Sequence, residues 1–209
     1  MLRVMPDLTF EYEALAEGLS PVAGVDEAGR GPWAGPVVAG AAILDPQALP
    51  DRLRYGLDDS KKLKADKREA LFELLLRHAT TGIGIADVGE IDRLNILQAT
   101  MLAMSRAVDD LGVKPGMVLV DGNRLPDLPC PAEALIKGDG RSLSIAAASI
   151  VAKVSRDKIM AKLAEEHPGY GWEHNAGYGT KRHQQGLAEF GITRHHRRSF
   201  KPIRQLLET

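Results

Sequence analysis

The chain has 209 residues, of which 44% are hydrophobic and 26% are charged, and its net charge is −1. This length allows one large domain with a substantial core, and the balanced charge argues against a globally basic nucleic-acid-binding protein. A single cysteine, Cys130, excludes an intrachain disulfide, and no apolar run reaches the ~18 residues of a membrane span, so we expect a cytoplasmic protein without a membrane partner.

In chain order, the predicted elements begin with a loose lead-in over residues 1–20, followed by apolar runs bounded by glycine or proline. These β-branched runs predict core strands, which we place at residues 21–29, 36–44, 79–88, 117–123 and 134–139. Helical periodicity predicts one helix that starts at Asp66 and two more over residues 91–112 and 142–167. The order of strands and helices predicts an α/β domain with a mixed sheet.

Two of these helices carry expectations about packing. The helix from Asp66 should have one apolar face, formed by Leu71, Leu74, Leu75 and His78. The small residues at 146–149 should allow the helix over 142–167 to approach the sheet closely. In the same helix Asp157 follows Lys153 by four residues, so an ion pair on the helix face is expected.

The C-terminal part of the chain is basic. Between Lys181 and Arg204 there are seven Lys or Arg residues and one acid, Glu189, which gives this segment a charge of +6. The asymmetry favours an anionic partner near the C-terminus, and the alternative is a solvated basic face. The nearby histidines lack the spacing of zinc ligands, which favours phosphate or solvent contact for His174, His183, His195 and His196.

Four acids follow or close predicted strands: Asp26, Glu27, Asp121 and Asp139. Each alone is compatible with an ordinary turn at a strand end. Acids at the ends of neighbouring strands come together in space, however, and oxygen ligands without a nearby His or Cys pattern favour Mg²⁺ or Mn²⁺ over zinc. A pair of metals bound by carboxylates is a common arrangement for hydrolysing phosphodiesters.

The stretch after the first two acids is also informative. Adjacent residues on a strand point to opposite faces, so Asp26 and Glu27 can both bind metal only if the strand ends or bends there. Gly29 and Gly31 would permit such a bend, and the backbone N–H groups around Arg30 could bind a phosphate or a sugar hydroxyl. The alternative is a tight turn with a solvated Arg30.

Five segments together resemble bacterial ribonuclease HII. They keep the order of that family and span residues 24 to about 200, and the first and fourth are long and specific. The segments are "GVDEAGRGPWAGPVVAGAAIL", "DSKKL", "VDGN", "IKGDGRSLSIAAASIVAKVSRDKIM" and "NAGYGTKRH".

The resemblance implies a ribonuclease H-like fold, with a five-stranded mixed sheet flanked by helices and a small C-terminal helical region. It divides the chain into a lead-in (1–20), a catalytic domain (21–165) and a basic helical segment (166–209) that packs on this domain and completes the substrate site. The implied activity is endonucleolytic cleavage of the RNA strand in RNA–DNA hybrids, with roles in primer and ribonucleotide removal. The enzyme would also nick on the 5′ side of single ribonucleotides in duplex DNA, as a monomer with two Mn²⁺ or Mg²⁺ ions, leaving a 3′-OH and a 5′-phosphate.

The resemblance also assigns residues. The acidic positions of the family fall on Asp26, Glu27, Asp121 and Asp139, and the element that reads the ribose 2′-OH falls on Gly29, Arg30 and Gly31. The tyrosine that senses the RNA–DNA junction falls on Tyr178, and "SKKL" places Lys61 and Lys62 near the substrate backbone. Trp33 stands where Leu is commoner, and Ala176 stands where a Lys often precedes "GYGT". The missing Lys could weaken one phosphate contact.

Two other functions stay open at this point. A nuclease of the same fold, such as a junction resolvase, would also use clustered acids but needs no reader of the 2′-OH. A non-catalytic module that binds RNA–DNA hybrids is the second alternative, although four carboxylates repel phosphate unless metals intervene. The C-terminal "QLLET" is too weak a signal to predict a partner such as the replication clamp.

Overall fold

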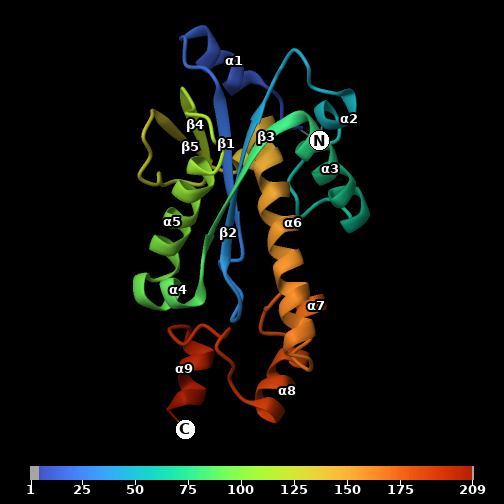
Figure 1. Cartoon of the computed structure of the whole chain (residues 1–209), viewed down its shortest axis with the longest axis vertical. Helices are drawn as coiled ribbons and strands as arrows, with labels where there is room; N and C mark the ends of the chain where they lie inside the picture. Colours follow the sequence, from blue (N-terminus) through green and yellow to red (C-terminus); the bar gives the residue numbers. More distant parts are fainter. Residues whose placement is uncertain (1–4, 209) are drawn as a thin grey trace.

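A computed structural model describes residues 5–208 and is built around one mixed sheet (Figure 1). The five strands lie in the order β3-β2-β1-β4-β5, with β1 antiparallel to β2 and parallel to β4. This arrangement confirms the predicted five-stranded mixed sheet. The strand bounds are β1 Val22–Ala28, β2 Val37–Leu44, β3 Ala79–Ala86, β4 Met117–Asp121 and β5 Ala132–Leu135.

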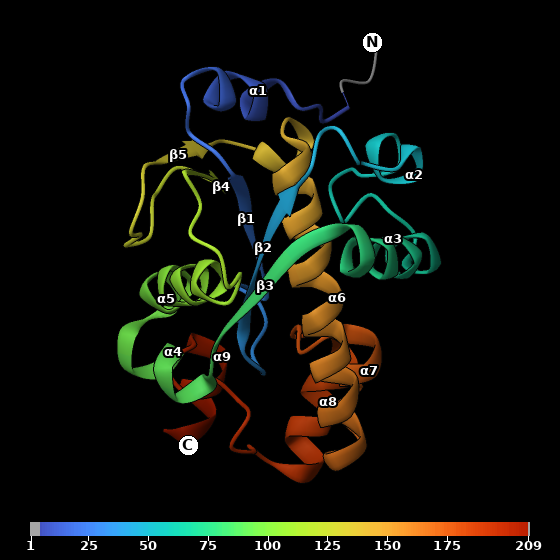
Figure 2. The same ribbon diagram turned by 45° about the horizontal axis from the view of Figure 1, so that its top comes forward.

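Helices cover both faces of the sheet (Figure 2). Helices α3 and α6 share one apolar core with β2, whereas α5 packs on the opposite face against β3, β2 and β1, in a core that also includes residues of β4. The helix bounds are α1 Thr9–Ala16, α2 Asp51–Arg54, α3 Ala65–His78, α4 Val88–Leu94, α5 Ile96–Asp109, α6 Leu143–Glu166, α7 Trp172–Asn175, α8 Lys181–Phe190 and α9 Lys201–Leu207, with a 3₁₀ helix at Gly138–Gly140.

Helix α6 lies unusually close to the sheet, as its small residues predict. A Cβ atom at Gly24 of β1 would collide with the backbone of Ser144, and one at Gly40 of β2 would collide with the carbonyl of Ala148. Helix and strands therefore meet backbone to backbone, which excludes any larger residue at these two positions.

The predicted helix over 91–112 is wrong in its continuity, because α4 and α5 form two helices separated at Asn95. The backbone of Asn95 has φ 72°, and its side chain caps α5 by accepting from the amides of Leu97 and Gln98 at 3.0 and 3.2 Å. An Asn at such a position offers a local acceptor that competes with helix continuation. The first helix begins one turn earlier than predicted, with a capping box between Asp87 and Glu90.

Three further expectations differ from the structure. The segment expected to be a loose lead-in contains α1, and the last strand ends at Leu135, so Asp139 lies in a 3₁₀ helix rather than at a strand end. On α3, His78 is exposed and Phe72 is buried, so the apolar face of this helix includes Phe72 and ends before His78.

The predicted ion pair between Lys153 and Asp157 on α6 is confirmed, with 2.7 Å between the two side chains.

The C-terminal segment carries α7, α8 and α9 and packs beside the last turns of α6 and the loop before β2 (Figure 1). A small apolar cluster joins Met160 of α6 to Trp172 and other residues of this segment. The segment is also tied to the body through Asp92 of α4, whose carboxylate accepts from the backbone N–H groups of Arg198 and Ser199 at 3.0 and 2.9 Å. Among residues 5–208, no helix combines the length and apolar character that crossing a bilayer requires.

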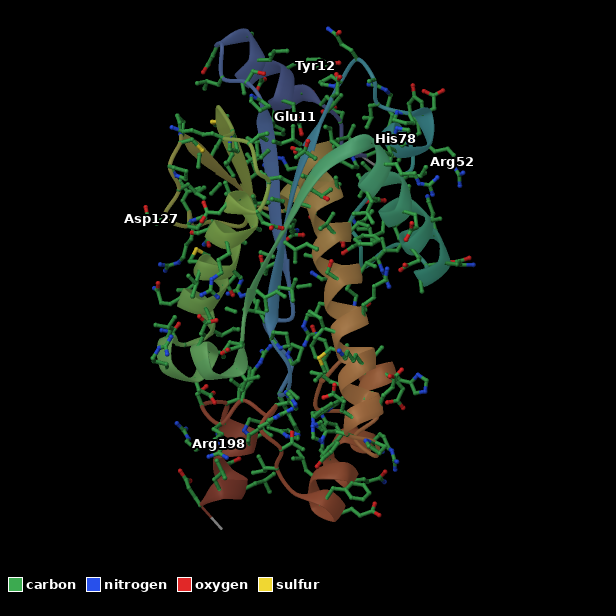
Figure 3. The ribbon with its side chains drawn as sticks, viewed as in Figure 1. Glu11, Tyr12, Arg52, His78, Asp127 and Arg198 are labelled. Atoms are coloured by element: carbon green, nitrogen blue, oxygen red, sulfur yellow. The ribbon has the colours of Figure 1, made fainter. Side chains whose placement is uncertain are left out.

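Helix α1 anchors the start of α6 through a buried carboxylate (Figure 3). Glu11 Oε1 accepts from the Oγ of Ser142 and from both the Oγ and the backbone N–H of Ser144, at 2.6 to 2.9 Å. Glu11 is only 5% exposed, so its removal would leave buried donors unsatisfied.

We therefore expect Glu11→Ala to lower the free energy of unfolding by about 1–3 kcal/mol, because buried donors without an acceptor carry their full desolvation cost. Urea unfolding would measure the change. Glu13→Ala, at an exposed position of the same helix, is the matched control and should be close to neutral. Equal stability of the two variants would contradict the anchoring role.

Candidate active site

Asp26 and Asp121 are brought together by the parallel pairing of β1 and β4. Val25 pairs with Val120 in the register, so Asp26 and Asp121 are the next residues on the two strands. Because the two strands are parallel and their pairing stops just before these acids, both acids lie at the same end of the strand pair. Asp26 is 6% exposed, and its Oδ1 accepts from the backbone N–H of Glu27 at 2.7 Å.

Glu27 joins the same cluster although β1 does not end there. The strand continues to Ala28 and remains paired with β2, so a strand end at Asp26 and Glu27 is wrong. Pairing with β4 stops at Val25, however, which leaves the edge beside Glu27 open for its longer side chain. Carboxylate oxygens of Asp26, Glu27 and Asp121 lie within 4.8 Å of one another.

Asp139 lies beside this cluster on the turn that precedes α6. The backbone N–H of Gly138 donates to Asp121 Oδ1 at 2.7 Å, which fixes the turn against the end of β4. The preceding residue, Lys137, has φ 57° and directs the chain into the 3₁₀ helix. Asp139 is therefore held close to Asp121 by the loop rather than by the sheet.

The acids repel one another and are partly removed from water. Burial, and then the charges of Glu27 and Asp121, raise the pKa of Asp26 well above its ordinary value. Burial also raises the pKa of Glu27, although Arg30, whose Nη1 lies 3.3 Å from Glu27 Oε1, opposes the rise. Burial and nearby carboxylates raise the pKa of Asp139 to about 6. A cluster held against this repulsion is the electrostatic signature of a cation site.

The donor set fits hard divalent cations. All three clustered side chains offer carboxylate oxygens, which Mg²⁺ and Mn²⁺ prefer, and the cluster holds neither His nor Cys. A bound cation would relieve the repulsion that raises the pKa values of these acids. The geometry therefore fits the metal chemistry that the sequence suggests.

Lys61 lies at the border of the acidic cluster. Burial alone would lower its pKa, but the charges of Asp26, Asp59 and Asp139 raise it. The loop that carries Lys61 is fixed to α6, because the Oγ atoms of Ser60 and Ser149 lie 2.7 Å apart in the protein interior. Because Ser60 directly precedes Lys61, this buried contact holds the Lys61 backbone beside the acids.

Lys62 contacts a further pair of acids. Its Nζ is 3.6 Å from both Asp58 Oδ1 and Asp59 Oδ2, and its side chain is 54% exposed. The charges of Lys61 and Lys62 both oppose the rise in the pKa of Asp139, so both lysines lie near the acids, and the charge of Lys61 also acts on Glu27.

A cavity of about 310 Å³ adjoins the acids at Glu27. Predicted site residues line much of it: Glu27, Gly29, Arg30, Gly31, Lys61 and Tyr178. Gly29 has φ +97°, as its predicted turn requires. At Gly31 a Cβ atom would lie 3.2 Å from the ring of Tyr178, so the missing side chain leaves room for the tyrosine. The structure thus joins two motifs that are almost 150 residues apart in the sequence.

Sequence reasoning missed two cations of this cavity, Lys153 and Arg156 of α6. Together with Ser149 they recur at intervals of three and four residues, which is the spacing of one helix face. Three polar residues at this spacing, on a helix whose other residues on that side are mostly small and apolar, were the sequence signal that could have identified the two cations.

Two histidines of the C-terminal segment contact each other and neighbouring protein groups. His183 and His196 are buried, with their Nε2 atoms 3.0 Å apart. His183 Nδ1 lies 3.0 Å from the carbonyl oxygen of Tyr178, and His196 Nδ1 accepts from the backbone N–H of Thr193 at 3.0 Å. Burial lowers the pKa of both rings, that of His196 to about 4. All four ring nitrogens are therefore engaged within the protein, and contact with phosphate or solvent, as favoured from the sequence, is wrong for this pair.

A second group of possible metal ligands lies at the end of α6. Ligand atoms of Glu166, His167 and His195 lie within 4.8 Å of one another. Arg194 Nε already donates to His195 Nε2 at 3.1 Å, however, which occupies that nitrogen. The expectation of no zinc site among the histidines thus stays a prediction.

The pKa of Asp139 gives a pH-dependent prediction for the protein in chelator. A carboxyl whose pKa rises on folding, here from 3.8 to about 6, contributes stability below its ordinary pKa and loses it as the pH rises through the folded value. Asp139→Asn cannot ionise, so at neutral pH its free energy of unfolding should exceed that of the wild type by roughly 1 kcal/mol, after discounting for solvent screening.

Urea unfolding across the acidic to neutral range would measure this difference, which should vanish once the pH falls to about 4. Asp127→Asn, on the exposed loop between β4 and β5 (Figure 3), is the matched control. A variant less stable than the wild type near neutral pH would contradict the repulsion described above.

Known proteins resemble this chain over nearly its whole length. The family model described as Ribonuclease HII matches residues 23–203. The Ribonuclease HII of Paramagnetospirillum magneticum is 59% identical over 203 residues, which cover 97% of this chain and 99% of the relative. That of Ruegeria pomeroyi is 57% identical over 203 residues, covering 97% of this chain and 85% of the relative.

Solved structures share the fold. The ribonuclease H2 of Pyrococcus horikoshii has a TM-score of 0.76 and 31% identity, covering 90% of this chain and 97% of that one. Ribonuclease HII of Archaeoglobus fulgidus, solved in complex with PCNA, has a TM-score of 0.72 and 28% identity, covering 86% and 95%. Bst-RNase HIII with Mn²⁺, at 18% identity and a TM-score of 0.72 over 90% and 69%, shares the fold alone. The chain belongs to the ribonuclease HII family and is an endoribonuclease that hydrolyses the RNA strand of RNA–DNA hybrids.

Proposed function

We propose that this enzyme also nicks duplex DNA on the 5′ side of a single embedded ribonucleotide, leaving a 3′-OH and a 5′-phosphate. The observation that carries the proposal is the cavity at Glu27, because the acids that hydrolyse the phosphodiester and the turn over Gly29–Gly31 share this residue. A group that reads one ribose would therefore lie directly beside the group that cuts the adjacent bond.

In this proposal Asp26, Glu27, Asp121 and Asp139 hold two divalent cations, Mn²⁺ or Mg²⁺. When bound, the cations would activate a water for in-line attack and stabilise the departing 3′-oxygen. The carboxylates fix the position of the scissile phosphate relative to the cavity, and the Arg30 side chain orients Glu27 through their contact at 3.3 Å. The donor set, made of carboxylate oxygens alone, supports either of these two ions.

Substrate recognition falls to the cavity residues. The 2′-OH is the group that distinguishes a ribonucleotide from a deoxyribonucleotide at one position. We assign its recognition to Gly29, Arg30 and Gly31, with the half-exposed ring of Tyr178 packed on the neighbouring sugar. Lys61 contacts the substrate backbone near the acids, and Lys62, which is turned toward Asp58 and Asp59, serves a more distant phosphate.

The residues after 165 complete the substrate site in this proposal, because Tyr178 belongs to them and their remaining exposed cations can track the duplex backbone. The enzyme acts as a monomer in ribonucleotide and primer removal. We place this activity in the cytoplasm, since its curated relatives are bacterial proteins and bacterial chromosomes replicate there.

Three labelled duplexes test the cleavage proposal: all-DNA, DNA with one ribonucleotide, and an RNA–DNA hybrid. We expect a nick 5′ to the lone ribonucleotide and cuts in the hybrid with Mn²⁺ or Mg²⁺, and none in chelator. Asp26→Asn should lower the rate by at least about 100-fold, because it removes a charge that holds the metal.

The pattern of products separates the alternatives. Cleavage of all-DNA at a similar rate would support a resolvase-like specificity, and binding of the hybrid without cleavage would support a binding module. Cutting of the hybrid without the nick at a lone ribonucleotide would overturn the proposed second activity.

The role of Tyr178 gives a separate prediction. Tyr178→Ala should lower kcat/KM on the single-ribonucleotide duplex by about tenfold, since aromatic packing on a nucleotide contributes about 1–3 kcal/mol. Tyr178→Phe should keep most of the activity, because the ring rather than the hydroxyl makes the contact. Tyr55→Ala, at an exposed position beside α2, is the control. A Phe variant as impaired as the Ala variant would contradict ring packing.

A further inference from the structure

Two arginines are buried beneath the turn over Gly29–Gly31. Arg197 has 0% and Arg156 1% of its surface exposed. In the part of the chain that the structure describes, neither guanidinium lies within 4.0 Å of a carboxylate oxygen. A buried cation without a counter-charge is costly unless its donors are satisfied, so the positions of these two side chains require an explanation.

Arg197 satisfies its donors with backbone carbonyls. Its Nη2 donates to the oxygens of Gly29 at 2.6 Å and Pro36 at 3.1 Å. Its Nη1 donates to Arg30 at 2.9 Å, and its Nε donates to Gly35 at 2.9 Å. One planar guanidinium therefore binds two consecutive carbonyls of the turn and two consecutive carbonyls directly before β2.

Arg156 supports the same region from α6. Its three nitrogens donate to the carbonyls of Pro36 at 3.0 Å, Ala176 at 2.9 Å and Ala34 at 3.2 Å. A Cβ atom at Gly29 would collide with this guanidinium, so the turn lies directly against it. Arg156 thus joins the turn to the loop that leads into Tyr178.

The carbonyl contacts determine where the N–H groups of the turn point. In a trans peptide the C=O and N–H bonds are antiparallel, so the amides of Arg30 and Gly31 are directed away from Arg197. Within residues 5–208 neither amide has a hydrogen-bond partner. The cavity at Glu27 is lined by these two residues and not by Arg197, so the free amides lie on its side of the turn.

We propose that Arg197 is a positioning residue for ribose recognition: its fork holds two consecutive peptide planes so that the amides of Arg30 and Gly31 are preorganised to donate to the 2′-oxygen. The inference rests on the proposed function and extends it to a residue remote in sequence. Lysine cannot replace arginine here, because an ammonium is a point charge without the planar fork that binds both carbonyls. Preorganised donors bind their acceptor without a cost of ordering the loop.

The test uses Arg197→Lys, which keeps the charge and removes the fork. Fluorescence anisotropy in Ca²⁺ would give the affinity for a duplex with one ribonucleotide and for the matching all-DNA duplex. The ratio of the two affinities should fall at least about fivefold, the value of one hydrogen bond, while binding of all-DNA stays within about twofold of the wild type. Arg106→Lys, at an arginine that binds Glu90 and the carbonyl of Ile85, is the matched control and should leave the ratio unchanged.

The outcomes separate the inference from the function on which it rests. Equal discrimination by wild type and Arg197→Lys overturns the role of Arg197 alone. Equal weakening on both duplexes shows a structural role only and also overturns it. A wild type that binds both duplexes equally overturns the proposed 2′-OH reading itself, and the inference falls with it.

A measurement on the wild type decides the matter if Arg197→Lys does not fold. The ¹⁵N relaxation of Arg30 and Gly31 in the free enzyme should match that of β1, with order parameters of about 0.85. Their amide shifts should change on adding the single-ribonucleotide duplex more than on adding all-DNA. Order parameters below about 0.6 would show a mobile turn and overturn the proposal.

Discussion

The backbone contact between α6 and the sheet is the constraint on which the site depends. With no side chain at Gly24 or Gly40, the helix lies directly on β1 and β2. One face of the helix then runs past the end of β1, where Ser149 holds the Ser60 loop and Arg156 binds carbonyls of the residues before β2. The same helix starts immediately after the turn that carries Asp139. A shift of α6 would therefore displace a lysine, a carbonyl network and an acid together.

Electrostatics divides the site into two parts of opposite sign. Three carboxylates gather at the ends of β1 and β4, and two guanidiniums lie buried behind the neighbouring turn. Burial lowers the pKa of Arg156 to about 10, and burial together with Arg156 lowers that of Arg197 to about 9, so both remain cations at neutral pH. Neither part neutralises the other within the protein. The carboxylates are left for a cation that arrives from solution, whereas the guanidiniums are satisfied by backbone carbonyls and hold the turn.

The strands and the meeting of the acids were predictable from the sequence, because apolar runs mark the strands and the acids follow them. The β-branched runs predicted the strands, and acids at the ends of β1 and β4 could be expected to meet because parallel strands end together. The break at Asn95 and the loop position of Asp139 were not predictable from apolar periodicity, since both depend on local hydrogen bonds. In the sequence, Arg197 is one of seven basic residues of the C-terminal segment. Its burial could not be inferred, because the carbonyls that satisfy it come from residues more than 160 positions earlier.

The contact between Asp92 and the residues after Arg197 has a consequence for how a substrate is accommodated. The C-terminal segment is covalently continuous with α6 and is also held by α4 through this carboxylate, so it is attached to the body at two separated points. A part fixed at both ends has little freedom to close around a ligand by a hinge motion. Tyr178 lies in the sequence between these two points of attachment, so a duplex meets this ring as part of the body of the enzyme and not as part of a loose arm.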